Sequence, residues 1–307
     1  MFRKGQNYRI FINGSVVAEE TSCSVTRGVD TEDASNKDLA SDSTSGEISG
    51  ANPVATSKNA QFQVEAQGEG AIALFLTALA LMNAYGGAVG LAPTNSTNNR
   101  TPQGNVNYVK AICNDLTINA PNRQPVTCSA QFTAIPGTPT IRVPSSQGTL
   151  SAAGYTVLRG EFLRLFLGAS GSEAVIAQAT NCSLHLSLSM EDATTKDDTS
   201  ASSDSLDYKA QAPTQINYDI SSDCIYEGGL HTLTEGTTYH WTLAKASGNG
   251  QATMDDVLAS GNAMLASIVA NAPVNQNITY NGSFTGIGVL DAASSDSDEE
   301  SDEESGT

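Results

Sequence analysis

The chain has 307 residues, of which 39% are hydrophobic and 16% are charged, and its formal net charge is −18. The length predicts about two domains. The acidic balance argues against free nucleic-acid binding, which needs Lys and Arg to neutralise phosphates. Seven of the acids lie between Asp296 and Glu304, a block typical of a disordered, self-repelling tail. The longest apolar run, Ala71 to Met82, is shorter than the roughly 20 residues of a membrane span, so no membrane partner is expected.

Two blocks of sequence recur in the same order, which predicts an internal duplication. Residues 23–38 read CSVTRGVDTEDASNKD and residues 182–197 read CSLHLSLSMEDATTKD, with seven identities in sixteen positions. Residues 119–135 read NAPNRQPVTCSAQFTAI and residues 271–287 read NAPVNQNITYNGSFTGI, with eight identities in seventeen positions. Each copy is long enough to fold on its own.

Alternating side chains predict the first strands of each copy. Residues 6–12 read QNYRIFI, with alternate residues on one face, and Leu163–Leu167 is the weaker match to this strand in the second copy. Asn13-Gly14 then predicts a tight hairpin. The strand that follows is Ser22–Thr26, whose counterpart Cys182–Leu188 has apolar residues at every second position.

A long polar stretch follows in each copy, at about Ser35–Lys58 and Thr194–Ala212. Neither stretch can bury enough apolar area to belong to a core. Loops of this length inside a compact domain are usually functional or disordered. A strand is predicted after each of them, at residues 61–66 and 215–220.

One convincing helix is predicted at Gly70–Asn83, where Ala and Leu dominate and Gly86-Gly87 ends the pattern. Its counterpart in the second copy is short, around Tyr226–Leu233, and a strand follows at Thr238–Leu243. Two strands around an Asn-Ala-Pro turn close each copy, with Pro121 and Pro273 in the turns.

The predicted fold class is mainly β, with two tandem β-sandwich or half-barrel domains, each with one flanking helix and one long loop. The expected boundaries are 1–136 for copy 1, 137–158 for a linker, 159–290 for copy 2 and 291–307 for the disordered acidic tail.

Candidate catalytic residues are few. Glu32-Asp33 and Glu191-Asp192 are the only acid pairs in the same place in both copies. Adjacent residues on a strand point to opposite faces, so these pairs cannot act together on one substrate atom. A structural or contact role at the loop entrance is favoured, with Lys37 or Lys196 as a possible ion-pair partner.

The metal-binding residue types are also sparse. The three histidines, His185, His231 and His240, show no metal-ligand spacing with a cysteine. The five cysteines lack CxxC spacing and are expected to be free, buried thiols. The sequence therefore predicts no enzyme, no metal and no cofactor.

Short motifs resemble the major tail tube proteins of siphophages. They are KGQNYRIFI at residues 4–12, LTINAP at 116–121 running into CSAQF at 128–132, and NGSFTGIG at 281–288. The resemblance covers nearly all of both copies. It implies β-sandwich domains whose sheets join into a continuous cylinder, with six domains in a ring and a long loop that reaches the adjacent ring. Copy 1 departs from the closing pattern, with Ala134 and Pro136 where copy 2 has Gly286 and Gly288.

The resemblance also implies a structural virion protein, which is assembled in the host cytoplasm and located in the tail. Its stacked rings would conduct DNA to the host cell without binding it specifically. The implied partners are further copies of the chain and other tail proteins (tape measure, terminator and baseplate). Two copies in one chain predict a ring of three chains with pseudo-sixfold symmetry, with a hexamer as the alternative. Expected inter-ring loop residues are Glu32, Asp33, Lys37, Asp38, Glu191, Asp192, Lys196 and Asp197.

Two other functions stay open. One is another virion ring or decoration protein, which would not polymerise into long tubes. The other is a duplicated carbohydrate-binding or adhesin β-module, which would need aromatic clusters on exposed loops. Aromatic residues make up 6% of this chain and Trp241 is its one tryptophan, so the adhesin is less favoured.

Overall fold

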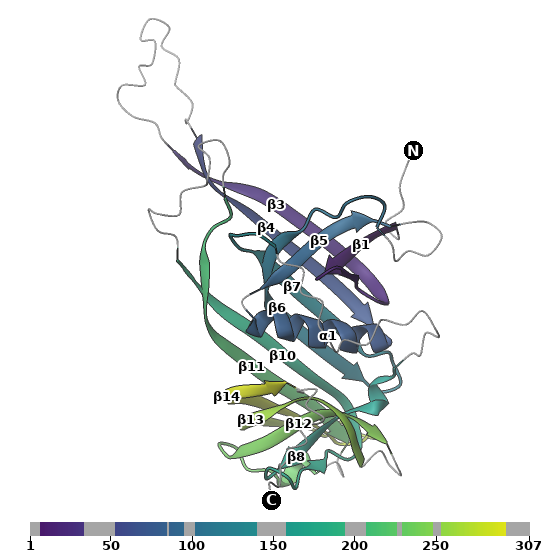
Figure 1. The fold of residues 1–307 in the computed structure, drawn as a ribbon. Helices are drawn as coiled ribbons and strands as arrows, with labels where there is room; N and C mark the ends of the chain where they lie inside the picture. The colour runs from purple at the N-terminus through teal and green to yellow at the C-terminus, as the bar shows by residue number, and fades with distance from the viewer. Residues whose placement is uncertain are drawn as a thin grey trace, which may run out of the picture. The chain divides into compact units, whose positions relative to one another are not determined.

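The computed structural model describes residues 7–33, 53–84, 86–94, 102–139, 158–193, 207–225, 229–247 and 253–292. Within these ranges the fold is mainly β, as predicted, with fourteen strands in one hydrogen-bonded sheet and one α-helix (Figure 1). The sheet does not close into a barrel.

The first half of the chain contains seven strands and the helix. In order they are β1 (Tyr8–Ile12), β2 (Ser15–Val16), β3 (Glu20–Asp33), β4 (Pro53–Gln67), α1 (Gly68–Asn83), β5 (Gly87–Pro93), β6 (Val109–Pro121) and β7 (Thr127–Ala134).

The second half contains seven more strands and two short 3-10 turns. In order they are η2 (Gly160–Phe162), β8 (Leu163–Gly168), β9 (Ala174–Val175), β10 (Ala179–Asp192), β11 (Gln211–Ile225), η4 (Leu230–Thr232), β12 (Thr238–Ser247), β13 (Thr253–Asn271) and β14 (Thr279–Ala292).

The two halves pair their strands in the same order. The first half has β2-β1-β5-β6-β7-β4-β3, and the second has β9-β8-β12-β13-β14-β11-β10. A local contact also recurs. The Sγ atom of Cys23 lies 3.8 Å from the carbonyl oxygen of Tyr8, and that of Cys182 lies 3.5 Å from the carbonyl oxygen of Leu163. Each strand of the first half therefore has a counterpart in the second.

The compact units of the chain do not follow its two halves. Unit 1 comprises Met1–Ile118, Thr127–Val143 and His185–Asn217, and unit 2 comprises Asn119–Val126, Pro144–Leu184 and Tyr218–Thr307. Strands β6, β10 and β11 contribute residues to both units. The boundaries expected for two copies, and for the linker between them, thus stay predictions.

The hairpin between β1 and β2 forms as the Asn-Gly pair predicts. Asn13 and Gly14 have φ values of 49° and 87°, and positive φ at both positions is what a type I′ turn requires. The turn places Ile12 opposite Ser15. The alternation in β10 is also confirmed, since every second residue from Cys182 to Leu188 is buried.

The helix α1 agrees with its prediction and packs against β4 and β7 (Figure 1). Phe62 on β4 and Phe132 on β7 are opposite each other, and both are fully buried, as is Phe75 on the helix. The first turn of α1 lies close to the turn between β2 and β3, because a Cβ atom on Gly70 would lie 2.3 Å from the carbonyl oxygen of Ala18. This position therefore needs a glycine.

The helix expected in the second copy is wrong in extent. Within the described part of 226–233, one 3-10 turn forms at Leu230–Thr232, after Gly229 in the left-handed region. So short a segment next to a glycine cannot offset the cost of starting an α-helix.

The polar stretches are shorter than predicted. Residues 53–58 belong to β4 and pair with the end of β3, and Gln211-Ala212 begin β11. Cross-strand backbone hydrogen bonds satisfy these polar segments without a core. Sequence reasoning also missed β5, which follows the glycines after α1 and pairs with β1.

Loss of a core aromatic ring should destabilise the fold strongly. We predict that Phe132→Ala lowers the free energy of unfolding by roughly 3–5 kcal/mol, because the ring is fully buried and its removal leaves a cavity. Val274→Ala, at a side chain 87% exposed, is the matched control and should change it by less than about 0.5 kcal/mol. Urea unfolding followed by circular dichroism measures both, and equal effects would contradict this packing.

Candidate assembly interface

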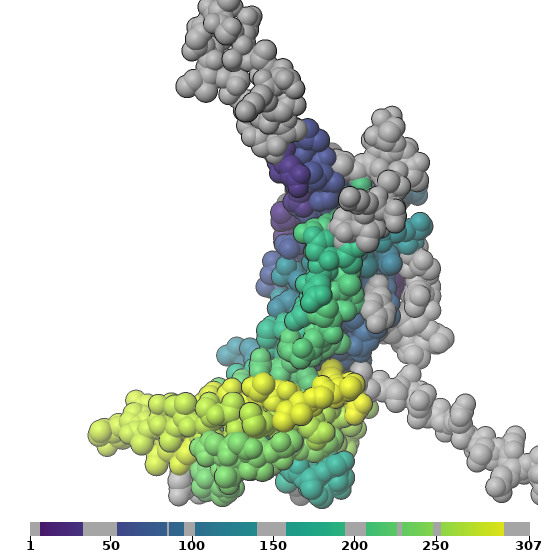
Figure 2. All heavy atoms as spheres, turned by 90° about the vertical axis from the view of Figure 1, so that its left-hand side faces the viewer, coloured from purple at the N-terminus to yellow at the C-terminus, as the bar shows by residue number. Residues whose placement is uncertain are grey.

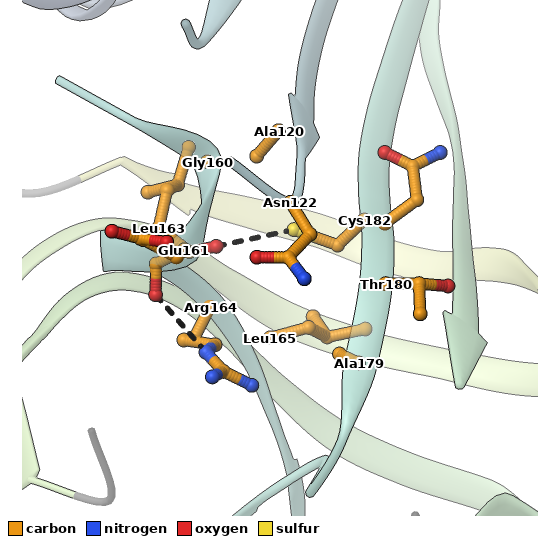
Figure 3. Close-up of a pocket in the computed structure, with 11 residues that line it drawn as sticks. Ala120, Asn122, Gly160, Glu161, Leu163, Arg164, Leu165, Ala179, Thr180 and Cys182 are labelled. Atoms are coloured by element: carbon orange, nitrogen blue, oxygen red, sulfur yellow. Dashed lines mark hydrogen bonds between the residues drawn. The ribbon is translucent and has the colours of Figure 1, made fainter. Parts of the chain in front are cut away.

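One small pocket lies within unit 2. It is lined by Asn122, Arg164, Cys182 and their neighbours and has a volume of about 10 Å³ (Figure 3). This is space for about one water molecule. Arg164 Nε donates to the carbonyl oxygen of Glu161 at 3.2 Å across this pocket. Among the described residues, no group of three or more His, Cys, Asp or Glu side chains could hold a metal ion.

The cysteines lack the environment of catalytic thiols. Four are buried, Cys23 is half-buried, and none forms a disulfide. Burial raises the pKa of Cys23 and of Cys182 to about 12. Nucleophilic chemistry needs the thiolate, so at neutral pH these side chains act as small apolar groups.

The predicted contact residues lie at the ends of counterpart strands. Glu32 and Asp33 end β3, Glu191 and Asp192 end β10, and the side chains of Glu32, Glu191 and Asp192 are exposed. The other four predicted residues, Lys37, Asp38, Lys196 and Asp197, lie outside the described residues.

Two antiparallel ribbons carry these strand ends. We call residues 28–33 with 53–59 arm 1, because β7 pairs with β4 only from Gln61 onward. Within it, the Asp30 carboxylate accepts hydrogen bonds from Ser57 Oγ at 2.9 Å and Asn59 Nδ2 at 2.8 Å. Arm 1 is thus held by polar cross-strand contacts and presents its side chains to solvent.

Residues 187–192 with 211–217 form the second ribbon, arm 2. Thr214 Oγ1 donates to the carbonyl oxygen of Ser189 at 3.1 Å, and Asn217 Nδ2 donates to its hydroxyl oxygen at 3.2 Å. β14 pairs with β11 only from Asp219 onward, so arm 2 also extends beyond its supporting strand.

A short segment that sequence reasoning missed connects the two arms. The backbone N–H of Lys58 donates to Asp207 at 2.9 Å, and that of Lys209 donates to Lys58 at 3.3 Å. Lys209 Nζ lies 2.9 Å from Asp192 Oδ2, and this hydrogen bond raises the pKa of Lys209. No sequence pattern marks these residues, because the contact depends on the register of β10 and β11.

The edges of β3 and β10 differ although the strands are counterparts. β10 has β11 on one edge and β6 on the other, whereas β3 pairs with β4 alone among the described strands. Val29 on β3 is 50% exposed, while Leu188 at the matching position of β10 is 8% exposed. A long open edge of this kind is a template for another strand.

The ribbon of β13 and β14 exposes apolar side chains. It lies at the surface in Figure 2, where it is yellow-green to yellow. Exposed fractions are 49% for Val269 and 83% for Val289, with Met264 and Ile287 also exposed. Together with the edge of β3, this ribbon is the candidate assembly interface.

No protein-family model and no curated protein matches the chain. Among solved structures, it is similar to a chain from the tail of an empty GTA particle refined with C6 symmetry. That similarity has a TM-score of 0.34 and 15% identity, and covers 44% of this chain and 98% of the other. Within the described ranges, no helix has the length and hydropathy that crossing a membrane requires.

Protonation of Glu20, the first residue of β3, should affect stability. Burial raises its pKa above the usual range, although its Oε2 accepts a hydrogen bond from the N–H of Ile10 at 3.1 Å. The folded state then keeps a proton that the unfolded state has released, so this residue lowers stability as pH rises from about 4.5 toward neutral.

We therefore predict that Glu20→Gln becomes progressively more stable relative to wild type over that pH window. The gain should not exceed about 1.4 kcal/mol for each pH unit. Urea titrations of both proteins between pH 4 and 7 test this, and a stability difference that does not vary with pH would contradict it.

Proposed function

We propose that this chain is a structural subunit of a phage-like tail tube, which assembles with its own copies through strand edges. The observation that carries the proposal is the edge of β3 that has no partner among the described strands, whereas the matching edge of its counterpart β10 is occupied. A strand of 14 residues that pairs along one edge invites another strand. In soluble proteins such edges are normally covered or kept short.

Head-to-tail association explains how the edges would be used. One surface of a chain binds a different surface of the next, and this closes into a ring when the rotation fits. Two domains in each chain give six domains in a ring of three chains. The three-chain ring therefore remains our preferred assembly, with a ring of six chains as the alternative.

The arms support a second set of contacts between rings. Both arms carry exposed polar and charged residues and are held by side-chain hydrogen bonds instead of a core. A solvated ribbon that extends past its sheet can insert between subunits of a neighbouring ring. We assign this role to arm 1 and arm 2, including Glu32, Glu191 and Asp192.

The proposed function needs no reactive side chain. The raised pKa values of Cys23 and Cys182 keep these thiols protonated at neutral pH, which suits a structural role. The net charge of −18 suits a conduit for DNA, since an acidic protein repels DNA instead of retaining it. Tail partners such as tape-measure, terminator and baseplate proteins belong to the same proposal.

The adhesin alternative loses its main candidate residue. Trp241, the one tryptophan, is 0% exposed and packs beside Tyr218, with ring centroids 5.7 Å apart. It cannot stack on a sugar without unfolding its surroundings. Another virion ring or decoration protein differs from the tube subunit only in whether its rings stack, so that alternative needs an assembly experiment.

Electron microscopy of the purified full chain tests the proposal. We expect rings with six similar lobes that stack into tubes as concentration rises, and a mass per ring of three chains by native mass spectrometry. A chain that stays monomeric at every concentration would contradict the proposed function. Rings that never stack would favour the decoration protein.

Stacking should depend on the ion pair between Lys209, in the segment that contacts arm 1, and Asp192 of arm 2. We predict that Lys209→Glu yields rings with shorter tubes at low salt, because it places a carboxylate beside Asp192. The double variant Lys209→Glu with Asp192→Lys restores the opposite charges and should restore tube length. Tube-length distributions from negative-stain images measure this, and equal lengths in all three proteins would exclude a role for the pair.

A further inference from the structure

The chain contains a joint between its two halves that shows how an open edge can be filled. β6 pairs with β7 along one edge. Along its other edge, β6 pairs first with β5, at residues 109–111, and then with β10. Within unit 1, His185 Nε2 on β10 lies 3.0 Å from Asp115 Oδ2 on β6. Within unit 2, the N–H of Asn122 donates to the carbonyl oxygen of Thr180 at 2.9 Å. The paired residue numbers rise on one strand and fall on the other, so the joint is antiparallel.

In the second half of the chain, the corresponding edge of β13 has no partner strand among the described strands. β14 pairs along one edge of β13 from Ala259 to Asn271. On the other edge, β12 pairs only as far as Met264, and the N–H of Leu265 then donates to Thr237. Residues 266–271 are therefore the counterpart of the part of β6 that receives β10. β3 is the counterpart of β10.

We propose that β3 of one chain pairs antiparallel with residues 266–271 of β13 in a second copy, and so reproduces the joint between β10 and β6. This inference rests on the proposed function and names its partner surface. The repeat offsets are 159 for β3 and β10, and 152 for β6 and β13. The backbone hydrogen bond between Asn122 and Thr180 sets the register of the inner joint. Transferred with these offsets, that register places Thr26 opposite Val269 in the outer joint.

Burial of side chains agrees with this pairing. In the inner joint the register places Leu186 opposite Leu116, and both side chains are 0% exposed. The corresponding residues at the outer edges are Arg27, which is exposed, and Ile268, which is half-buried. Pairing would cover Ile268 and the aliphatic part of Arg27, as it covers the leucines inside the chain.

The pairing also determines how chains associate. Among the described strands, β3 and residues 266–271 of β13 each have one unpaired edge. These two edges lie at the two ends of the path β3-β4-β7-β6-β10-β11-β14-β13. The contact is therefore between unlike surfaces, which closes into a ring when the rotation fits and does not give a twofold dimer. In a closed ring every intermolecular joint would alternate with an intramolecular joint of the same form.

Disulfide trapping tests the register directly. Thr26→Cys and Val269→Cys are made in separate chains that also carry Cys23→Ser, and the two proteins are mixed, assembled and oxidised. We expect a covalent dimer in the mixture and at least a tenfold lower yield with either protein alone. The matched control replaces Val269→Cys by Ile268→Cys, which turns the thiol to the opposite face of the strand. This control should give the same low yield.

Combining Thr26→Cys and Val269→Cys in one chain extends the test to the closed ring. The covalent ladder on a non-reducing gel should stop at three chains. If the protein forms rings by electron microscopy but the trapped yield does not exceed that of the Ile268→Cys control, the proposed joint is wrong while the tube function stands. If neither rings nor trapped dimers form, both proposals fail.

A second pair of variants does not depend on thiol chemistry. Ile268→Asp should give a folded chain that no longer forms rings, because it places a carboxylate where the joint covers an apolar side chain, whereas Ile268→Val should assemble as wild type does. Circular dichroism checks the fold and size-exclusion chromatography measures assembly. Assembly of Ile268→Asp to the wild-type extent would overturn the joint.

Discussion

Backbone hydrogen bonding at strand edges is the constraint on which this structure depends. Every residue of a strand has an N–H and a C=O that need partners, and a sheet supplies them everywhere except at its edges. Among the described strands, β3 has one partner strand, whereas its counterpart β10 has both edges occupied. The difference between these counterparts makes the open edge a recognisable feature and not a general property of β proteins.

In the ring that we propose, a duplicated chain would have a particular advantage. A chain whose halves have paired would already contain one of the joints of that ring, without the loss of translational freedom that a second molecule costs. The inner joint can also differ chemically from the outer one. It contains His185 and Asp115, whereas the corresponding outer positions are Thr26 and Ser267. The two joints can therefore evolve separately within one gene product.

Local sequence patterns predicted the parts of the fold that depend on neighbours in the chain. The Asn13-Gly14 turn, the α1 helix and the alternation in β10 follow from turn chemistry and hydrophobic periodicity, and the structure confirms them. The outer part of β4 and the Lys209–Asp192 contact were missed because their polar residues gain their structure from a strand far away in the sequence. Of the predicted contact residues, Glu32, Glu191 and Asp192 lie at exposed strand ends, and Lys209, the ionic partner of Asp192, lies outside the motif.

The most direct measurement of the central claim is amide hydrogen exchange on the full chain, compared between its unassembled and assembled forms. The account predicts that amides of residues 24–29 on β3 and 266–271 on β13 exchange more slowly after assembly, while amides of α1 keep the same rates. Exchange at both edges that is as fast in assembled particles as in free chains would contradict the claim that strand edges join the subunits.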